Sequence, residues 1–384
     1  MSVFFENYSV GHALKREITE LYISVAIKNF AVSMIALFEP VYLYDKLNFS
    51  LAEIMLYFAA VYTLYFFLLP LGGKISARFG FEHSILYSAP VIVLYFATLY
   101  LTGEIRSLIY FAPVLLAVYK TLFWPAYHAN FAHYTTLGQR GKRISRLGAL
   151  NALVVVVGPL LGGMLITLFS FNVLFVVVSI LVLASVIPLF TTHETFKPSS
   201  FGYFHAFARL FKSHYRRYVL GFMGYGEELI KLTVWPIFIF VILKSYLGLG
   251  TLSSVTIFLT AIFGLFIGRI VDKKGGRQML RFSTIGYSIV WFVRLAVKST
   301  LGVFVVDGFS RIFSQGLGIP MQALVYDKGT ERGNLNFGVF FEMALVVGKM
   351  LIAWVLFVVF LYTQNIGIAF VLGGVLSLLY LLVK

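Results

Sequence analysis

Polar and charged side chains recur four residues apart inside long apolar stretches of this sequence. Residues four apart lie on one face of an α-helix, so each run predicts a polar stripe on an otherwise apolar helix. Placing an ionisable group inside a membrane costs about 2.5–3.5 kcal/mol on insertion scales, so such groups are candidates for function. The runs are Lys120, Trp124 and His128; Glu227, Lys231 and Trp235; and Asp307, Arg311 and Gln315.

The acids on these stripes could carry protons. Burial raises the pKa of a carboxyl group, whereas a nearby cation lowers it. A structural change that separates Glu227 from Lys231, or Asp307 from Arg311, would therefore let the acid bind a proton. The other interpretation, which the sequence leaves open, is that each pair is a neutralised structural link between helices.

Two further stretches carry charged residues on one helical face. Lys28 and Glu39 are eleven residues apart, which at about 100° per residue returns to nearly the same face. Glu342 and Lys349 are seven apart and also share a face. Lys28 and Lys120 have no acid one helical turn away, so they need partners on other helices or an anionic substrate. All of these residues are candidates for a substrate or proton pathway.

Other functional classes find no support in the sequence. His128 stands alone, and a single histidine is more often a hydrogen-bonded packing residue than a metal ligand. We find no paired metal ligands, phosphate-binding loop or nucleophile motif, and the chain has no cysteine for thiol chemistry. We therefore predict no enzyme activity, no metal and no cofactor. Arg294 and Lys298, near the end of an apolar stretch, are expected to extend to the membrane interface.

The elements that must position these residues are membrane-spanning helices. Of the 384 residues, 60% are hydrophobic and 12% are charged, too few polar residues to cover the surface of a soluble protein. A helix needs roughly 20 apolar residues to cross a bilayer, and such runs follow one another almost without interruption. We predict an all-α membrane protein with about twelve spans, at 20–43, 51–71, 83–102, 108–134, 147–169, 171–191, 218–243, 250–270, 280–298, 300–325, 337–362 and 364–383.

The net charge of +15 lies mainly in alternate connections between these runs. Positive charge marks the cytoplasmic connections of membrane proteins, so we predict that both termini are cytoplasmic, and nucleic-acid binding is not indicated. The long connection 191–217 separates two predicted six-helix bundles, 1–190 and 218–384. It contains an amphipathic segment, 204–215, that we expect to lie on the membrane surface; a disordered linker is the alternative.

A short basic motif connects two of the apolar runs. Residues 268–277 read Gly-Arg-Ile-Val-Asp-Lys-Lys-Gly-Gly-Arg, and a weaker copy lies half a chain earlier at 73–80, with Ala77 in the place of Asp272. The motif resembles the loop signature of the major facilitator superfamily of secondary transporters, and two copies at this spacing indicate a duplicated unit. We predict that 268–277 is a tight turn between two membrane helices. We also predict a conformational gate formed by residues of both copies: Gly73, Arg78, Gly80, Gly268, Asp272, Lys273, Gly275 and Arg277.

The resemblance implies two six-helix bundles around a central cavity, with the first, fourth, seventh and tenth spans lining it, and transport by alternating access. It also implies that Asp272 latches the halves together by meeting the start of the fifth span near Arg143 and Arg146. We therefore predict a monomeric secondary active transporter in the plasma membrane, of the prokaryotic inner-membrane type. Its partners are the lipid bilayer and a small polar organic solute, with protons or a solute gradient as the driving force.

The fifth span contains the sequence Gly-Pro-Leu-Leu-Gly-Gly at 158–163. Glycine lets helices approach closely and proline bends a helix, so a packing hinge is one interpretation. The sequence also resembles the core of the span-five motif of exporters in this family, with Val154 in place of a glycine of the fuller pattern. Efflux of amphipathic compounds or lipids is therefore an alternative function, as is a sensor of the same fold that transports nothing. The motif adds Gly158, Pro159, Gly162 and Gly163 to the candidate gate.

Overall fold

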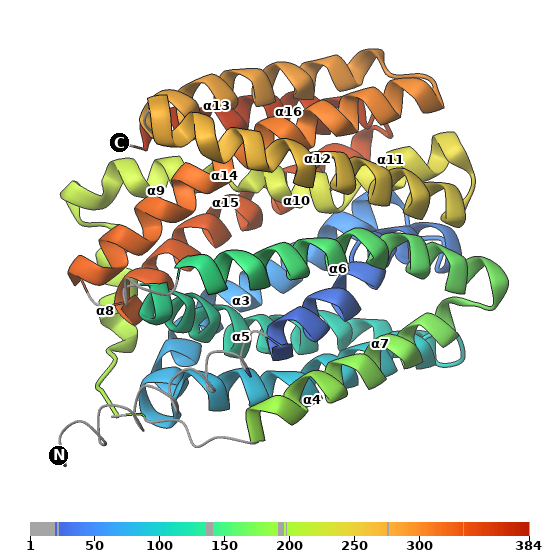
Figure 1. Cartoon of the computed structure of the whole chain (residues 1–384). Helices are drawn as coiled ribbons and strands as arrows, with labels where there is room; N and C mark the ends of the chain where they lie inside the picture. The colour runs from blue at the N-terminus through green and yellow to red at the C-terminus, as the bar shows by residue number, and fades with distance from the viewer. Residues whose placement is uncertain are drawn as a thin grey trace, which may run out of the picture.

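The computed structural model describes residues 20, 23–135, 141–190, 196, 198–274, 276–332 and 334–383. Throughout these residues the chain is helical with short connections, and none of them belongs to a β-strand. The longer helices lie side by side with roughly parallel axes (Figure 1). This agrees with the all-α architecture that the apolar runs predict.

Six helices of the described chain are long and apolar enough to cross a membrane. They are Ile23–Lys46, Leu51–Phe79, Phe81–Leu101, Arg106–Asn130, Tyr246–Phe263 and Leu335–Tyr362. Shorter apolar helices occur at Val154–Leu168, Phe171–Val186 and Gly367–Leu382. The apolar surface of these helices is the reason that the chain belongs in a lipid bilayer.

Tight connections join the helices of the first half. Ser50 Oγ accepts a hydrogen bond from the Glu53 amide (3.2 Å), while the Glu53 carboxylate accepts one from the Ser50 amide (2.8 Å), which caps the following helix. Gly80 alone separates two helices, with a φ of 103° that glycine adopts readily. The elements are α2 (Glu39–Val41), α3 (Leu51–Phe79), α4 (Phe81–Leu101), α5 (Ala112–Thr135), α6 (Gly141–Leu168) and α7 (Phe171–Val186).

The second half departs from the prediction at its first span. The helix predicted over 218–243 is three short helices, with one break before Gly226 and another at Thr233. Proline lacks an amide hydrogen and is best accommodated in the first turn of a helix. A new helix begins at Val234 and has Pro236 in that turn. The elements are α9 (Arg216–Met223), α10 (Gly226–Leu232), α11 (Val234–Leu243), α12 (Tyr246–Lys274), α13 (Gly276–Val293), α14 (Thr300–Arg332), α15 (Asn334–Tyr362) and α16 (Gly367–Ser377).

The basic turn predicted over 268–277 is wrong in its extent. Helix α12 continues to Lys274 and α13 begins at Gly276, so the motif lies almost entirely on helix ends. With 29 residues, α12 is roughly 43 Å long at 1.5 Å per residue, which exceeds the hydrocarbon thickness of about 30 Å. The charged end of the helix can therefore stand outside the apolar layer without a turn.

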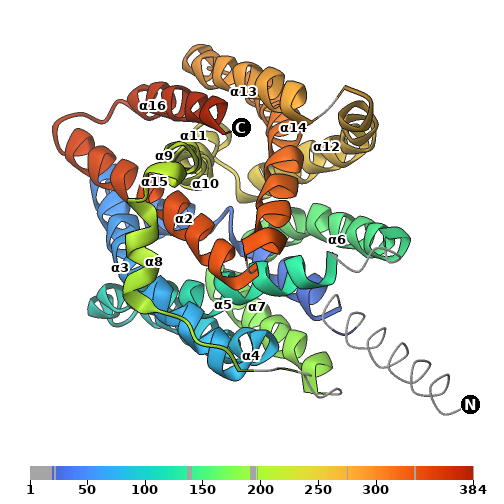
Figure 2. The ribbon, with the colours of Figure 1, turned by 90° about the vertical axis from the view of Figure 1, so that its left-hand side faces the viewer.

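Two pairs of helices join the halves. Helix α15 lies along α3, and α12 lies along α6, as the end view in Figure 2 shows. Glycine makes the second pair close: a Cβ atom at Gly250 would lie 2.2 Å from the Pro159 carbonyl oxygen, and one at Gly163 would lie 2.6 Å from the Tyr246 carbonyl oxygen. These contacts bring side chains of both halves together.

The connection between the halves contains a helix. Helix α8 (Tyr203–Leu210) is shorter than the predicted 204–215, and a 3₁₀ turn (Ser213–Tyr215) follows it. Its residues Ala206 and Leu210 are buried, and the helix contacts both α3 and α15. The described part of this connection is therefore ordered against the bundle.

Candidate functional site

Glu342 connects the two halves of the chain. Its carboxylate, buried on α15, accepts a hydrogen bond from the Tyr65 hydroxyl of α3 (2.9 Å to Oε2). The other carboxylate oxygen, Oε1, lies 2.8 Å from Nε2 of His128 on α5. His128 is therefore hydrogen-bonded, as predicted, and its partner is an acid from the other half.

Cations from both halves flank the ring of Tyr62 on α3. The Nζ atoms of Lys120 (α5) and Lys349 (α15) lie 5.5 and 5.7 Å from the ring centre. Lys349 forms an ion pair with Glu228 of α10 (2.6 Å from Nζ to Oε2). The residues of this region, here called the central cluster, are Tyr62, Tyr65, Lys120, His128, Glu228, Glu342 and Lys349.

Trp124 completes the stripe that the sequence predicts on α5. Its ring stacks on His128, with ring centres 5.6 Å apart and an angle of 25° between the planes. Lys120, Trp124 and His128 therefore line up on one side of α5, and the two polar residues contact the central cluster. The role of this stripe in a substrate or proton pathway stays a prediction.

Asp307 on α14 is the centre of a second polar group. Its carboxylate accepts hydrogen bonds from Trp235 Nε1 (3.0 Å), the Thr256 hydroxyl (2.6 Å) and Arg311 Nε (2.7 Å). Asp307 and Arg311 form an ion pair within α14, and Trp235 joins the same acid from α11. Gln315, one turn farther along α14, is exposed and is not part of this group.

Glu227 does not form the predicted pair with Lys231. Its buried carboxylate accepts hydrogen bonds from the hydroxyls of Tyr287 on α13 (2.8 Å) and Tyr380 near the end of the chain (3.1 Å). Because α10 ends before Trp235, Glu227, Lys231 and Trp235 also do not share one continuous helical face.

The expectation that Arg294 reaches the membrane interface is wrong. Its side chain is 1% exposed and lies between two indole rings, with Cζ 4.3 Å from the centre of Trp235 and 3.6 Å from that of Trp291. Its Nη2 donates to the Ser310 hydroxyl (2.7 Å). The aromatic faces stabilise the buried guanidinium in place of water.

Lys28 and Glu39 occupy different surroundings. Lys28 is 4% exposed, and its Nζ lies over the Phe123 ring with no hydrogen-bond partner among the described residues. Glu39 accepts a hydrogen bond from the Tyr95 hydroxyl (2.7 Å). A turn at 36–38 interrupts the helix between them, so the shared face predicted for a continuous helix is not formed.

The first copy of the basic motif packs against the connection between the halves. A Cβ atom at Gly73 would lie 2.9 Å from the Phe201 ring and 3.0 Å from Val339 of α15. The Ser199 amide donates to the Ala77 carbonyl (2.9 Å). Arg78 is exposed on α3 and Arg277 on α13. The predicted latch of Asp272, the side chain of Lys273 and the contacts of Gly268 and Gly275 lie outside what the structure describes.

The Gly-Pro-Leu-Leu-Gly-Gly segment lies where α6 meets two other elements. Cβ atoms at Gly158 and Gly162 would lie 1.8 Å from Ser33 Oγ and 2.0 Å from the Met34 carbonyl oxygen. The Pro159 carbonyl faces Gly250 of α12, as described above. These contacts favour the interpretation of this segment as a packing hinge.

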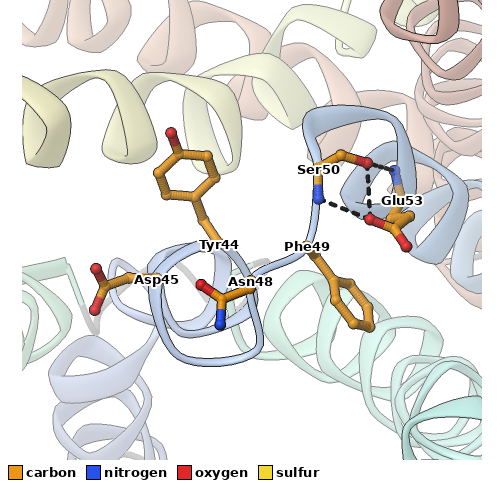
Figure 3. A pocket seen from close by; sticks show the side chains of 6 residues that line it. All are labelled: Tyr44, Asp45, Asn48, Phe49, Ser50 and Glu53. Atoms are coloured by element: carbon orange, nitrogen blue, oxygen red, sulfur yellow. Dashed lines mark hydrogen bonds between the residues drawn. The ribbon is translucent and has the colours of Figure 1, made fainter.

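An open hollow of about 390 Å³ lies between the first helix and α3. Figure 3 shows its lining, which includes the capped start of α3 at Ser50 and Glu53. Asp45, also in the lining, accepts a hydrogen bond from the Tyr246 hydroxyl of α12. None of the predicted pathway residues lines this hollow, so it is not the candidate site.

Comparison with known proteins gives a family and a fold. The family described as Major Facilitator Superfamily matches residues 21–226. No curated protein sequence matches the chain significantly. The solved nucleoside transporter NupG (D323A mutant) is similar over 96% of this chain and 100% of its own, with a TM-score of 0.69 and 14% identity. A bacterial homologue of the human drug peptide transporters PepT1 and PepT2 is similar over 95% of this chain and 97% of its own, with a TM-score of 0.63 and 12% identity.

Proposed function

Because this chain belongs to the Major Facilitator Superfamily, we propose that it is a secondary active transporter that moves a small polar organic solute by alternating access, coupled to protons. The central cluster carries the proposal. Buried and partly buried ionisable residues from α3, α5, α10 and α15 meet where the two halves touch. Such groups are expensive in a membrane, so they mark a pathway for substrate or protons. We assign no enzyme activity to the chain.

Proton coupling is assigned to Glu342 with His128. An acid can couple a proton to movement if its surroundings change between the two states, and the loss of a hydrogen-bond partner is one such change. The described partners of Asp307 and Glu227 all lie in the second half, so rocking of the halves would leave them together. Glu342, in contrast, has both partners in the first half. Separation of the halves would therefore expose it to protonation.

The solute is proposed to bind beside the central cluster. Mixed charges and aromatic rings suit a polar organic compound with its own charged or hydrogen-bonding groups. The alternative of efflux of amphipathic compounds or lipids rests on the segment at 158–163, which packs as a hinge. The structural neighbours named above transport nucleosides and peptides, and these compounds are the first candidates. We further propose a monomer in the plasma membrane with both termini in the cytoplasm.

The experiment is a screen for thermal stabilisation of the purified protein. The library contains nucleosides, short peptides, amphipathic cations and lipids, so that it separates the proposed function from its alternative. Compounds that stabilise the protein are then tested for uptake and exchange in proteoliposomes. Stabilisation by a polar solute that also exchanges across the membrane supports the proposal. Stabilisation by amphipathic compounds alone, or ligand binding without exchange, contradicts it.

A further inference from the structure

Helix α8 is fixed to both halves through one of its sides. The Tyr203 hydroxyl donates to the Phe67 carbonyl of α3 (3.0 Å), and the Phe207 ring centre lies 5.4 Å from that of Phe66. Arg209 donates to the carbonyl and side-chain oxygens of Asn336 on α15 (2.7 and 3.3 Å). Figure 2 shows α8 lying across these two helices. Its position relative to the bundle is therefore defined.

The opposite side of this segment is apolar and basic. Phe204 and Phe211 are 81% and 85% exposed. Contact between water and large aromatic side chains such as these is unfavourable. Lys212, Arg216 and Arg217 are exposed beside them. No aspartate or glutamate occurs between residues 198 and 226, so the positive charge of this surface is not compensated within the segment.

The surroundings of α8 point to lipid. Phe67, to which Tyr203 is bonded, is 54% exposed and lies inside the candidate span Leu51–Phe79. Helix α8 thus begins on a side of α3 that faces hydrocarbon. A helix that begins at this part of α3 lies in the membrane interface. Phe204 is then at the edge of the acyl chains, and the bases that follow it are at the level of the headgroups.

We propose that α8 and the bases after it, Lys212, Arg216 and Arg217, form a binding surface for anionic lipid headgroups in the leaflet at this end of the bundle. The chemistry that recognises the lipid is a pair of aromatic side chains in the interface with three exposed cations beside them. Each such base contributes about fivefold to attraction by an anionic membrane surface. The surface anchors the connection between the halves in the plane of the membrane, whichever solute the protein moves.

The test uses a fluorescent label at one position of the full-length chain. Because the chain has no cysteine, Ala208→Cys on the exposed side of α8 gives a single site for an environment-sensitive dye. The protein is placed in nanodiscs of phosphatidylcholine, with or without phosphatidylglycerol. We expect blue-shifted emission and reduced iodide quenching with phosphatidylglycerol, and loss of this difference in the triple variant Lys212→Gln, Arg216→Gln, Arg217→Gln.

The matched control removes three exposed bases from connections at the other end of the bundle, with Arg106→Gln, Lys244→Gln and Lys298→Gln. It should keep the full difference between the two lipid compositions, and both triple variants are checked for the same helical circular dichroism. Equal quenching in both lipids, or an unchanged difference in the first triple variant, would overturn the proposal. Protection that depends on the number of protein copies per disc rather than on phosphatidylglycerol would also overturn it, because a second chain would then cover the surface.

Discussion

Nε2 of His128 lies 2.8 Å from Oε1 of Glu342, and this contact crosses the boundary between the two halves of the chain. Tyr65 holds the second oxygen of the same carboxylate. Three helices, α3, α5 and α15, therefore meet at one buried acid. An interaction of this kind stabilises the arrangement in which the halves touch here, and it is lost when they separate.

His128 and Glu342 should be energetically coupled, so that their effects on stability are not additive. Glu342→Ala or His128→Ala alone leaves a buried polar group without its partner, which costs about 1–3 kcal/mol. The double variant should lose less than the sum of the two, because neither group then remains unpaired. Thermal unfolding of the four proteins in detergent measures this cycle. Additive losses would show that the two side chains do not interact.

Asp307 and Arg311 should behave as a structural pair. Asp307→Asn leaves the partly exposed guanidinium of Arg311 without its anion, which should lower stability by less than the about 3–5 kcal/mol of a fully buried pair. Arg311→Gln added to Asp307→Asn should recover much of the loss. The thermal midpoints of the single and double variants provide the measurement. A double variant no more stable than Asp307→Asn would contradict a structural role for the pair.

Lys28 should destabilise the empty protein. Its ammonium group is buried over the Phe123 ring without a hydrogen-bond partner among the described residues. The ring face offsets only part of the hydration that a buried charge loses. Lys28→Met keeps the length of the side chain and removes the charge, so it should raise the thermal midpoint. If the solute is anionic, the same variant should no longer be stabilised by it. A lower midpoint without solute would argue against this account of Lys28.

The stripe on α5 and the pair of Asp307 with Arg311 could be predicted because charged residues stand out in an apolar sequence. The faces predicted for Glu227 with Trp235 and for Lys28 with Glu39 could not, because breaks in the helices separate these residues. The tyrosines that hold Glu227 and Glu342 could not, since the chain has 23 tyrosines and nothing in their spacing separates a bonded hydroxyl from an interfacial one. The role of Glu228 could not be predicted because Glu227 stands next to it. Which of the two acids faces Lys349 depends on the break in the helix before Gly226. The burial of Arg294 could not be predicted, because Trp235 and Ser310, which contact it together with the nearby Trp291, come from other helices.

The contact between α6 and α12 should not tolerate a side chain at Gly250. Its Cβ would meet the backbone carbonyl of Pro159, which cannot move without shifting α6. Gly250→Val should lower the thermal midpoint and the yield of folded protein, with an overpacking cost of about 1–3 kcal/mol. The control is Gly308→Ala on α14, where no atom lies within 4 Å of the added Cβ. Equal stability of Gly250→Val and the control would show that the two helices are not packed as described.

Proton-driven uptake by Glu342→Gln in proteoliposomes tests the central claim most directly. The amide keeps the size of the side chain and can still hydrogen-bond with Tyr65, but it cannot gain or lose a proton. With a solute from the stabilisation screen, the variant should exchange solute across the membrane and fail to accumulate it when a pH gradient is applied. Accumulation equal to that of the unaltered protein under the same gradient would contradict the assignment of Glu342 as the residue that couples protons to transport.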